Sequence, residues 1–298
     1  MRLLLLPVIV VLIAASTVLH VLPLLALALA KAVVPSTRAR RLATGGLTAI
    51  AESWIGFNSA LVDRFSGTRL VVDIDATLRR DGRYLVLSNH QSWVDIVMLQ
   101  RVFNRRIPLM RFFLKRQLIW VPLLGMAWWA LDFPFMTRAT PAQIARNPRL
   151  AGRDREATRR ACAKFRTLPV AIVNFVEGTR FTAAKHARQH DSGLRHLLRP
   201  KAGGVAFVLD AMDGALESVL DVTLAYPHGA PTLLDLLAGR VPEVRVHAVE
   251  RPIPAGVCGD YATDPDTRAR VQAWINAVWA EKDARLDAIR TRAVIPRA

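Results

Sequence analysis

Cysteines are few in this sequence, and several common motifs are missing. Its 298 residues include 2 cysteines, Cys162 and Cys258, which are too few for a disulfide framework and lack metal-ligand spacing. No Gly-x-Ser-x-Gly nucleophile elbow occurs, and no internal repeat or low-complexity stretch follows the N-terminal apolar run. These absences argue against a disulfide scaffold, a repeat array and a serine nucleophile of that kind. They favour a reducing compartment for the main domain.

Acidic residues are outnumbered by basic ones. The chain has 24 aspartates and glutamates against 41 lysines and arginines, a formal net charge of +17. Such an excess concentrates anions near the surface, so the expected partners are acidic lipid head groups, phosphorylated substrates or nucleic acid. A nucleic-acid fold signature and aromatic residues interleaved with basic ones are both missing. We therefore expect no nucleic-acid partner, and a non-catalytic binder of nucleic acid or anionic lipid is the remote alternative.

Formally charged residues are also missing between Leu3 and Ala30. About 20 apolar residues in a helix cross the ~30 Å hydrocarbon core of a bilayer, and this run is longer. A cleaved signal peptide has an apolar core of only about 7–15 residues, although Ala28 and Ala30 resemble a cleavage site. We predict a transmembrane or membrane-anchoring segment at residues 1–36, with cleavage as the alternative.

Positive charge flanks this segment unequally. Arg2 precedes the apolar run, and a larger basic cluster follows it, namely Lys31, Arg38, Arg40 and Arg41. Because the larger positive cluster stays on the cytoplasmic side, we expect the inner (cytoplasmic) membrane as the location, with the main domain on the cytosolic side. Pro23 leaves open whether the segment is a single-pass helix or a re-entrant hairpin.

Apolar periodicity divides the rest of the chain. Residues 37–68 are expected to form an amphipathic or linker helix, which either packs on the main domain or lies on the bilayer surface. Residues 69–298 are expected to form one domain in which β-type runs alternate with helical patterns. The strands are predicted at Leu70–Ile74, Tyr84–Ser88, Ile107–Phe112, Phe133–Thr137, Val170–Val176, Val219–Ala225 and Val244–Val249, and the helices at 91–103, 154–166, 203–213 and 265–290. This alternation predicts an α/β sheet with helices on both faces.

The stretch from Asn89 to Asp95 follows a predicted strand and precedes a predicted helix. With His90 in the turn and Asp95 in the first helical turn, the imidazole can donate one N–H to the carboxylate. The other ring nitrogen is then free to act as a base, and the helix dipole disfavours the imidazolium. The alternative is structural, because Ser92-x-x-Asp95 also fits a helix capping box. The spacing alone does not decide between them.

A second polar stretch, Glu177-Gly178-Thr179-Arg180, follows the most apolar predicted strand. Glycine permits a tight turn or close approach by a ligand. A threonine hydroxyl, exposed backbone N–H groups and an arginine fork together suit a phosphate. Taken alone, the stretch could also be an ordinary polar turn with a surface arginine.

Together, Asn89-His90-x4-Asp95 and Phe175-x-Glu177-Gly178-Thr179-Arg180 resemble the glycerolipid acyltransferases, specifically the 1-acylglycerol-3-phosphate acyltransferases. Lys115-x-x-Leu118 and Phe133 through Arg138 resemble further segments of that family. The stretches 198–201 and 220–227 are closer to a subgroup with lysocardiolipin acyltransferase-like enzymes. The resemblance extends from about residue 70 to 227, and Val176 stands where the family usually has proline. It implies a glycerolipid-acyltransferase-like α/β sheet flanked by helices, behind the N-terminal membrane-anchoring helix.

The resemblance also implies a reaction. His90, oriented by Asp95, would take the proton from the sn-2 hydroxyl of 1-acylglycerol-3-phosphate as that oxygen attacks an acyl thioester, forming phosphatidic acid. The implied substrate-binding residues are Glu177, Gly178, Thr179, Arg180, Lys115 and Arg138. The co-substrate would be acyl-CoA or acyl-carrier protein, with no cofactor. Alternative acceptors are lysophosphatidylglycerol, lysocardiolipin or a lipid A precursor.

No metal is expected. His186 and His190 are four residues apart and could share one helix face, but the sequence offers no convincing third ligand.

Overall fold

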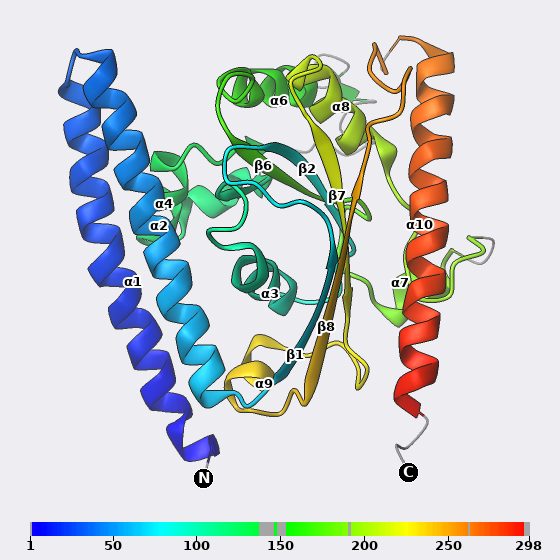
Figure 1. Ribbon diagram of the computed structural model, residues 1–298, viewed down its shortest axis with the longest axis horizontal. Coiled ribbons are helices and arrows are strands. Elements are labelled where there is room, and N and C mark those ends of the chain that lie inside the picture. The colour runs from blue at the N-terminus through cyan, green and yellow to red at the C-terminus, as the bar shows by residue number, and fades with distance from the viewer. Residues whose placement is uncertain (1, 137–145, 148–152, 190–191, 262, 295–298) are drawn as a thin grey trace.

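The computed structural model describes residues 2–136, 146–147, 153–189, 192–261 and 263–294. Its centre is a six-stranded sheet in the order β1-β8-β7-β2-β6-β3 (Figure 1). The strands are β1 (Arg69–Asp75), β2 (Arg83–Ser88), β3 (Met110–Phe112), β6 (Val170–Phe175), β7 (Ser218–Ala225) and β8 (Glu243–Arg251). All neighbouring pairs are parallel except β7 and β8, which are antiparallel. The predicted α/β sheet is confirmed.

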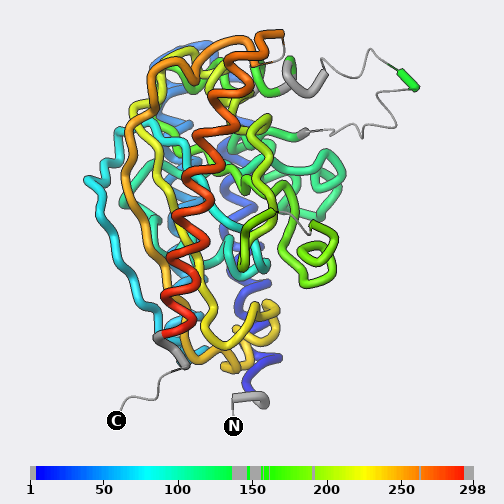
Figure 2. Tube along the Cα trace, turned by 90° about the vertical axis from the view of Figure 1, so that its right-hand side faces the viewer, coloured from blue at the N-terminus to red at the C-terminus, as the bar shows by residue number. Residues whose placement is uncertain are grey.

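The helices cover both faces of this sheet (Figure 1). They are α1 (Arg2–Val33), α2 (Thr37–Phe65), α3 (Val94–Phe103), α4 (Leu124–Ala130), α6 (Arg153–Ala163), α7 (Ala183–Ala187), α8 (Ala202–Met212), α9 (Leu233–Leu237) and α10 (Pro265–Val294), with a 3-10 helix η1 (Arg116–Trp120). One apolar cluster joins α1, α2, α3 and α9 to the sheet, and a second joins α6, α8 and α10 to it. Figure 2 shows α10 running along its face of the sheet.

The central strands are apolar because helices bury both of their faces. Every residue of β7 is buried, and so are all residues of β2 after Arg83. Their sequences accordingly read as continuous apolar runs rather than alternating patterns. Two of the predicted strands differ from expectation. The run Ile107–Phe112 pairs only from Met110 onward, and the run that begins at Phe133 supplies β5 (Phe135–Met136), which pairs with β4 (Leu114–Lys115) outside the main sheet.

The N-terminal apolar segment forms one continuous helix, α1, which passes through Pro23 without ending. By length and composition its residues 5–33 could cross a membrane. The chain reverses direction after α1 and not within it: α2 runs back along α1, so the two helices form a hairpin (Figure 1). Two polar contacts join the pair. The Trp54 indole donates to the Thr17 hydroxyl at 3.2 Å, and the His20 ring lies 3.2 Å from the Ser53 hydroxyl.

Helix α2 is also tied to the main domain. The carboxylate of buried Glu52 accepts a hydrogen bond of 2.9 Å from Arg80, and its backbone carbonyl accepts one of 3.1 Å from the Asn104 amide. The buried positions Leu47, Ile55 and Val62 recur at helical spacing and join the core. Of the two alternatives for this helix, the structure therefore shows packing against the domain.

Candidate active site

The polar stretches noted in the sequence meet at one edge of the sheet. Strands β2, β6 and β7 run parallel with β2 between the other two, so their carboxyl ends lie side by side. The segments after them carry His90, Glu177 and Tyr226. Ligands of open α/β sheets bind at the carboxyl ends of parallel strands. This edge is therefore where the topology places a site.

Asn89 holds the turn that carries His90. Its side-chain amide donates to the carbonyl of Leu224 at 2.9 Å, and its side-chain oxygen accepts from the Leu224 N–H at 2.8 Å. The amide thus makes a ladder-like pair with β7 where the backbone of β2 has ended. The carbonyl of His90 in turn accepts from the N–H of Phe181 at 2.7 Å. These contacts bind the turn to the segments that follow β6 and β7.

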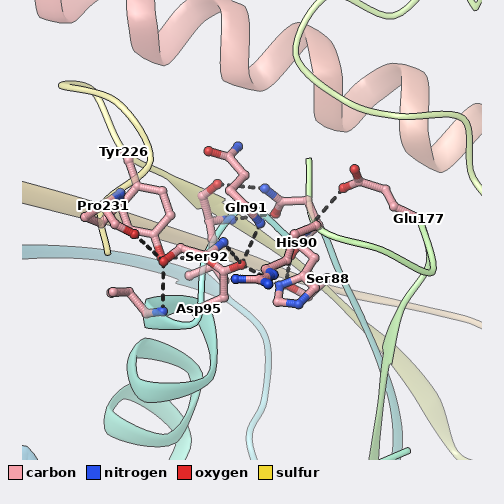
Figure 3. A network of polar contacts seen from close by, with 12 residues as sticks. Ser88, His90, Gln91, Ser92, Asp95, Glu177, Tyr226 and Pro231 are labelled. Carbon is pink, nitrogen blue, oxygen red and sulfur yellow. Dashed lines mark hydrogen bonds and ion pairs between the residues drawn. The ribbon is translucent and has the colours of Figure 1, made fainter. Parts of the chain in front are cut away.

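His90 and Asp95 are in direct contact, as expected. Nδ1 of His90 lies 2.8 Å from Oδ2 of Asp95 (Figure 3). The same oxygen accepts from the backbone N–H groups of Gln91 at 2.6 Å and Ser92 at 2.8 Å. The capping box is not formed, because the Asp95 N–H meets the carbonyl of Ser92 and not its hydroxyl. The Asp95 carboxylate instead binds the backbone amides just before α3 and also orients the imidazole. Its side chain is 0% exposed.

Tyr226 completes this network. Its hydroxyl donates to Oδ1 of Asp95 at 2.5 Å (Figure 3). Burial and the neighbouring Asp95 carboxylate hold the pKa of Tyr226 well above its ordinary value, so the phenol keeps its proton and remains a donor. The sequence comparison with the subgroup included Tyr226, but no local pattern indicated this contact.

The imidazole of His90 faces a cavity of about 400 Å³. One ring face stacks on Phe175 with centroids 4.0 Å apart and planes 17° apart, and the side chain remains 14% exposed. Since Nδ1 is held by Asp95, Nε2 is the nitrogen available for proton transfer. The geometry suits a general base at the wall of a cavity.

Glu177 is buried next to the cavity and is not one of the residues that line it. It is 1% exposed, and its two carboxylate oxygens accept from the backbone N–H groups of His90 at 3.1 Å and Leu198 at 3.2 Å. Burial raises its pKa to about 8, and Asp95 adds to the rise, while the two backbone hydrogen bonds oppose it. Glu177 therefore connects the His90 turn to the segment before α8, a contact the sequence did not indicate.

Four of the other predicted binding residues line the cavity: Gly178, Thr179, Arg180 and Lys115. One arginine and two lysines of its described lining supply positive charge. Gly178 adopts a positive φ of 69° in the turn after β6, which favours glycine. The guanidinium of Arg180 lies 5.1 Å from the ring centroid of Trp93. Lys115 in β4 also lines the cavity, and so does Lys185 in α7, which the sequence analysis did not select. Arg138 lies outside the described residues.

The remaining lining is mostly apolar: Ile96, Phe112, Phe113, Leu114, Leu118, Val173 and Phe175. No aspartate or glutamate belongs to the described lining of this cavity. Such a surface suits a ligand with an anionic part and a hydrocarbon part. Of the histidine pair considered above, the His186 ring contacts the Leu194 carbonyl at 2.7 Å, and His190 is outside the described residues. Groups of three or more metal-ligating side chains are not found in the described part of the chain.

Comparison with known proteins identifies relatives. The acyltransferase family model matches residues 69–226. Lysocardiolipin acyltransferase 1 of Gallus gallus is 27% identical over 252 residues, which are 80% of this chain and 61% of that protein. The Danio rerio protein of that name is 29% identical over 267 residues, 83% of this chain and 62% of its own length. The 1-acyl-sn-glycerol-3-phosphate acyltransferase delta of Bos taurus is 24% identical over 241 residues, 75% of this chain and 58% of its own.

The chain thus spans about three fifths of the length of the curated relatives it matches. Among solved structures, the crystal structure of the 1-acyl-sn-glycerophosphate acyltransferase PlsC from Thermotoga maritima is similar in fold. The TM-score is 0.53 at 17% sequence identity, with 94% of this chain and 97% of that chain covered.

Proposed function

This chain belongs to the acyltransferase family, and from that membership we propose that it transfers an acyl group from a thioester to the hydroxyl of a lysophospholipid. The observation that carries the proposal is the 2.8 Å contact between His90 Nδ1 and Asp95 beside a cavity with cationic and apolar walls. A general base, an anion-binding wall and a hydrocarbon-binding wall are the parts that this reaction needs.

In the proposed mechanism, Nε2 of His90 removes the proton from the acceptor hydroxyl while that oxygen attacks the thioester carbonyl. The carbon–sulfur bond then breaks, the ester forms, and the imidazolium returns its proton to the departing thiolate. The Asp95 carboxylate stabilises the imidazolium between these two transfers, and the Phe175 ring restricts its rotation. General base catalysis of this kind contributes about 10²- to 10⁴-fold.

The acceptor we propose is 1-acylglycerol-3-phosphate. Lys115 and Arg180 line the cavity, which supports the proposal that they bind its phosphate, and the apolar walls suit its acyl chain. The second candidate is another lysophospholipid, because relatives named lysocardiolipin acyltransferase 1 match most of this chain. Lysophosphatidylglycerol and a lipid A precursor share the required chemistry. The donor would be acyl-CoA or acyl-carrier protein.

A membrane is the proposed site of action. Large apolar side chains on α1, among them Val11, Leu19 and Leu29, are exposed in the structure. Trp120 and Trp129 are exposed as well, in η1 and α4 next to the cavity-lining segment. Moving an acyl chain into water costs about 0.8 kcal/mol per methylene, so a site held at the bilayer surface avoids that cost. We expect the main domain on the cytosolic side.

The first test replaces the proposed base. His90→Ala should abolish release of free thiol from acyl-CoA in the presence of lysophosphatidic acid, a loss of about 10²-fold or more. Exposed His228, which is absent from the cavity lining, offers the matched control His228→Ala, for which turnover should persist. Circular dichroism and vesicle binding would show that both variants are folded and attached. Normal turnover by His90→Ala would contradict the mechanism.

The second test determines the acceptor. Detergent-purified protein is given acyl-CoA or acyl-carrier protein with lysophosphatidic acid, lysophosphatidylglycerol or lysocardiolipin, and the esterified product is identified by mass spectrometry. We expect the highest kcat/KM with lysophosphatidic acid. A clear preference for either of the other acceptors would replace the first candidate by the second.

A further inference from the structure

Lys185 is a cation of the cavity that lies outside the family motifs noted in the sequence. It belongs to α7, where its backbone N–H donates to the Thr182 hydroxyl at 3.3 Å. Its ammonium donates to the Thr179 hydroxyl at 2.7 Å and to the Arg180 carbonyl at 2.9 Å. We propose that Lys185 determines the preference of this cavity for an acceptor that carries a phosphomonoester over one that carries a phosphodiester. This inference rests on the proposed function.

The first support is charge. Both acceptors of the Lys185 ammonium are neutral oxygens, so its positive charge is not compensated by them. Lys164 and Lys282 differ, because each is paired with a carboxylate. The Lys164 ammonium, for example, lies 2.5 Å from the Asp132 carboxylate. The half-buried Lys185 instead joins Lys115 and Arg180 in a described lining that contains no carboxylate. A phosphate is the ligand that compensates such a group of charges.

The second support is position. By binding the Thr179 side chain and the Arg180 backbone, Lys185 connects α7 to the turn after β6. The guanidinium of Arg180 extends from this turn over the exposed indole of Trp93. Lys185 thus adds a charge and also restrains the backbone from which Arg180 reaches the head group. The attraction of the added charge strengthens with the charge of the acceptor, so a phosphomonoester should gain more than a phosphodiester.

The test separates head-group binding from a general structural role. Lys185→Met keeps the apolar stem but removes the charge and the donors. The KM for lysophosphatidic acid should rise about 10- to 100-fold, as for loss of a hydrogen bond to a charged group, with kcat nearly unchanged. Lysophosphatidylglycerol should show a smaller rise. Lys185→Arg should restore most of the affinity. The matched control Arg188→Met removes an exposed charge from the C-cap of the same helix, outside the cavity lining, and should leave KM unchanged.

A binding measurement makes the test independent of turnover. Dodecyl phosphate, a phosphomonoester without a hydroxyl to acylate, should bind the full chain in calorimetry and bind Lys185→Met more weakly by a similar factor. Equal affinities in both proteins would overturn the inference. So would a loss of kcat at constant KM, or a rise in the KM for acyl-CoA alone, which would assign Lys185 to the donor. A wild-type protein that acylates no lysophospholipid but binds dodecyl phosphate through Lys185 would instead refute the proposed function.

Discussion

At the scale of the residue, Asp95 is the centre of the polar network around His90 (Figure 3). A buried carboxylate is costly unless its oxygens are satisfied. Here backbone N–H groups, the His90 ring and the Tyr226 hydroxyl all contact it. The local amides would suffice to hold a carboxylate at the start of a helix, so the phenol, contributed by the segment just after β7, is the additional partner. We expect it to hold the carboxylate in the position that orients the imidazole.

This expectation is tested by Tyr226→Phe. The change leaves Oδ1 of Asp95 buried without its donor, a cost of about 1–3 kcal/mol. We expect kcat to fall about 10-fold or more, because a less restrained carboxylate orients the imidazole less well and each ~1.4 kcal/mol lost from the transition state is tenfold in rate. Tyr84→Phe is the matched control, since the Tyr84 hydroxyl contacts the backbone of Arg79 at 3.0 Å and lies outside this network. It should lose some stability and retain kcat. Equal kcat values in the two variants would show that Tyr226 does not help to position Asp95 for catalysis.

Glu177 provides a pH-dependent prediction. Its pKa is raised from the ordinary 4.5 to about 8 in the folded chain because it is buried. Between these values the unfolded chain releases the proton while the folded chain keeps it. The contribution to the free energy of unfolding is therefore fully present below about pH 4.5 and is lost as pH rises through about 8.

The comparison is with Glu177→Gln, which cannot ionise. The stability of the wild type relative to this variant should fall from pH 5 to pH 9 in denaturant titrations. Parallel pH profiles for the two proteins would show that Glu177 ionises normally.

At the scale of the element, α10 is fastened to the sheet by a buried ion pair. The Lys282 ammonium lies 2.5 Å from Oδ1 of Asp221, both side chains are fully buried, and Lys282 also donates to the Val222 carbonyl at 2.6 Å. Arg251 of β8 contacts the other carboxylate oxygen at 3.0 Å. The same helix reaches the site indirectly, because Asp283 accepts from the backbone N–H groups of Arg195 and His196, in the segment that leads to Leu198.

Breaking this pair should weaken the attachment of α10 to the sheet and so lower the free energy of unfolding. Lys282→Met leaves a buried carboxylate short of one partner, and the expected loss is about 3–5 kcal/mol in the free energy of unfolding. Lys164→Met breaks the more exposed pair with Asp132 and should cost about 0–1 kcal/mol. Denaturant unfolding of both variants measures the difference. Losses of the same size would mean that the buried pair contributes no more than a surface one.

At the scale of the whole molecule, the apolar surface and the positive charge suit an acidic bilayer. Helix α1 uses one side to pack on α2 and exposes apolar residues on another. The contacts from Thr17 to Trp54 and from His20 to Ser53 bind the two helices together at mid-length. Any arrangement of α1 in a membrane must therefore keep this pairing or break both contacts. A net charge of +17 adds attraction to anionic head groups.

Vesicle flotation tests this surface. Val11→Glu combined with Leu19→Glu places two charges on exposed positions of α1. Binding to phosphatidylglycerol vesicles should fall about 10-fold or more, since burial of one such side chain stabilises by about 1.5–3 kcal/mol. Ala277→Glu with Ala284→Glu adds the same charge to exposed positions of α10 and should weaken binding less. If both double variants bind equally, α1 is not the docking surface.

The sequence by itself determined the local parts of this protein. Alternating strand and helix patterns predicted the α/β class. The position of His90 between a strand and a helix made a contact with Asp95, five residues away, possible, and the resemblance of the two motifs to the acyltransferases predicted it. These features depend on periodicity and on short spacings, which the backbone converts directly into geometry. For Gly178 the sequence suggested a tight turn or close approach by a ligand, and the positive φ that it adopts shows the turn.

Only the tertiary structure decided how distant segments complete the site. Tyr226 contacts Asp95 across 131 positions of the chain, and Glu177 contacts His90 across 87. Such contacts follow from the strand order, which places β6 and β7 on either side of β2 and which no local pattern encodes. The role of Lys185 and the pairing of α1 with α2 were hidden for the same reason. Each depends on which surfaces meet after the chain has folded.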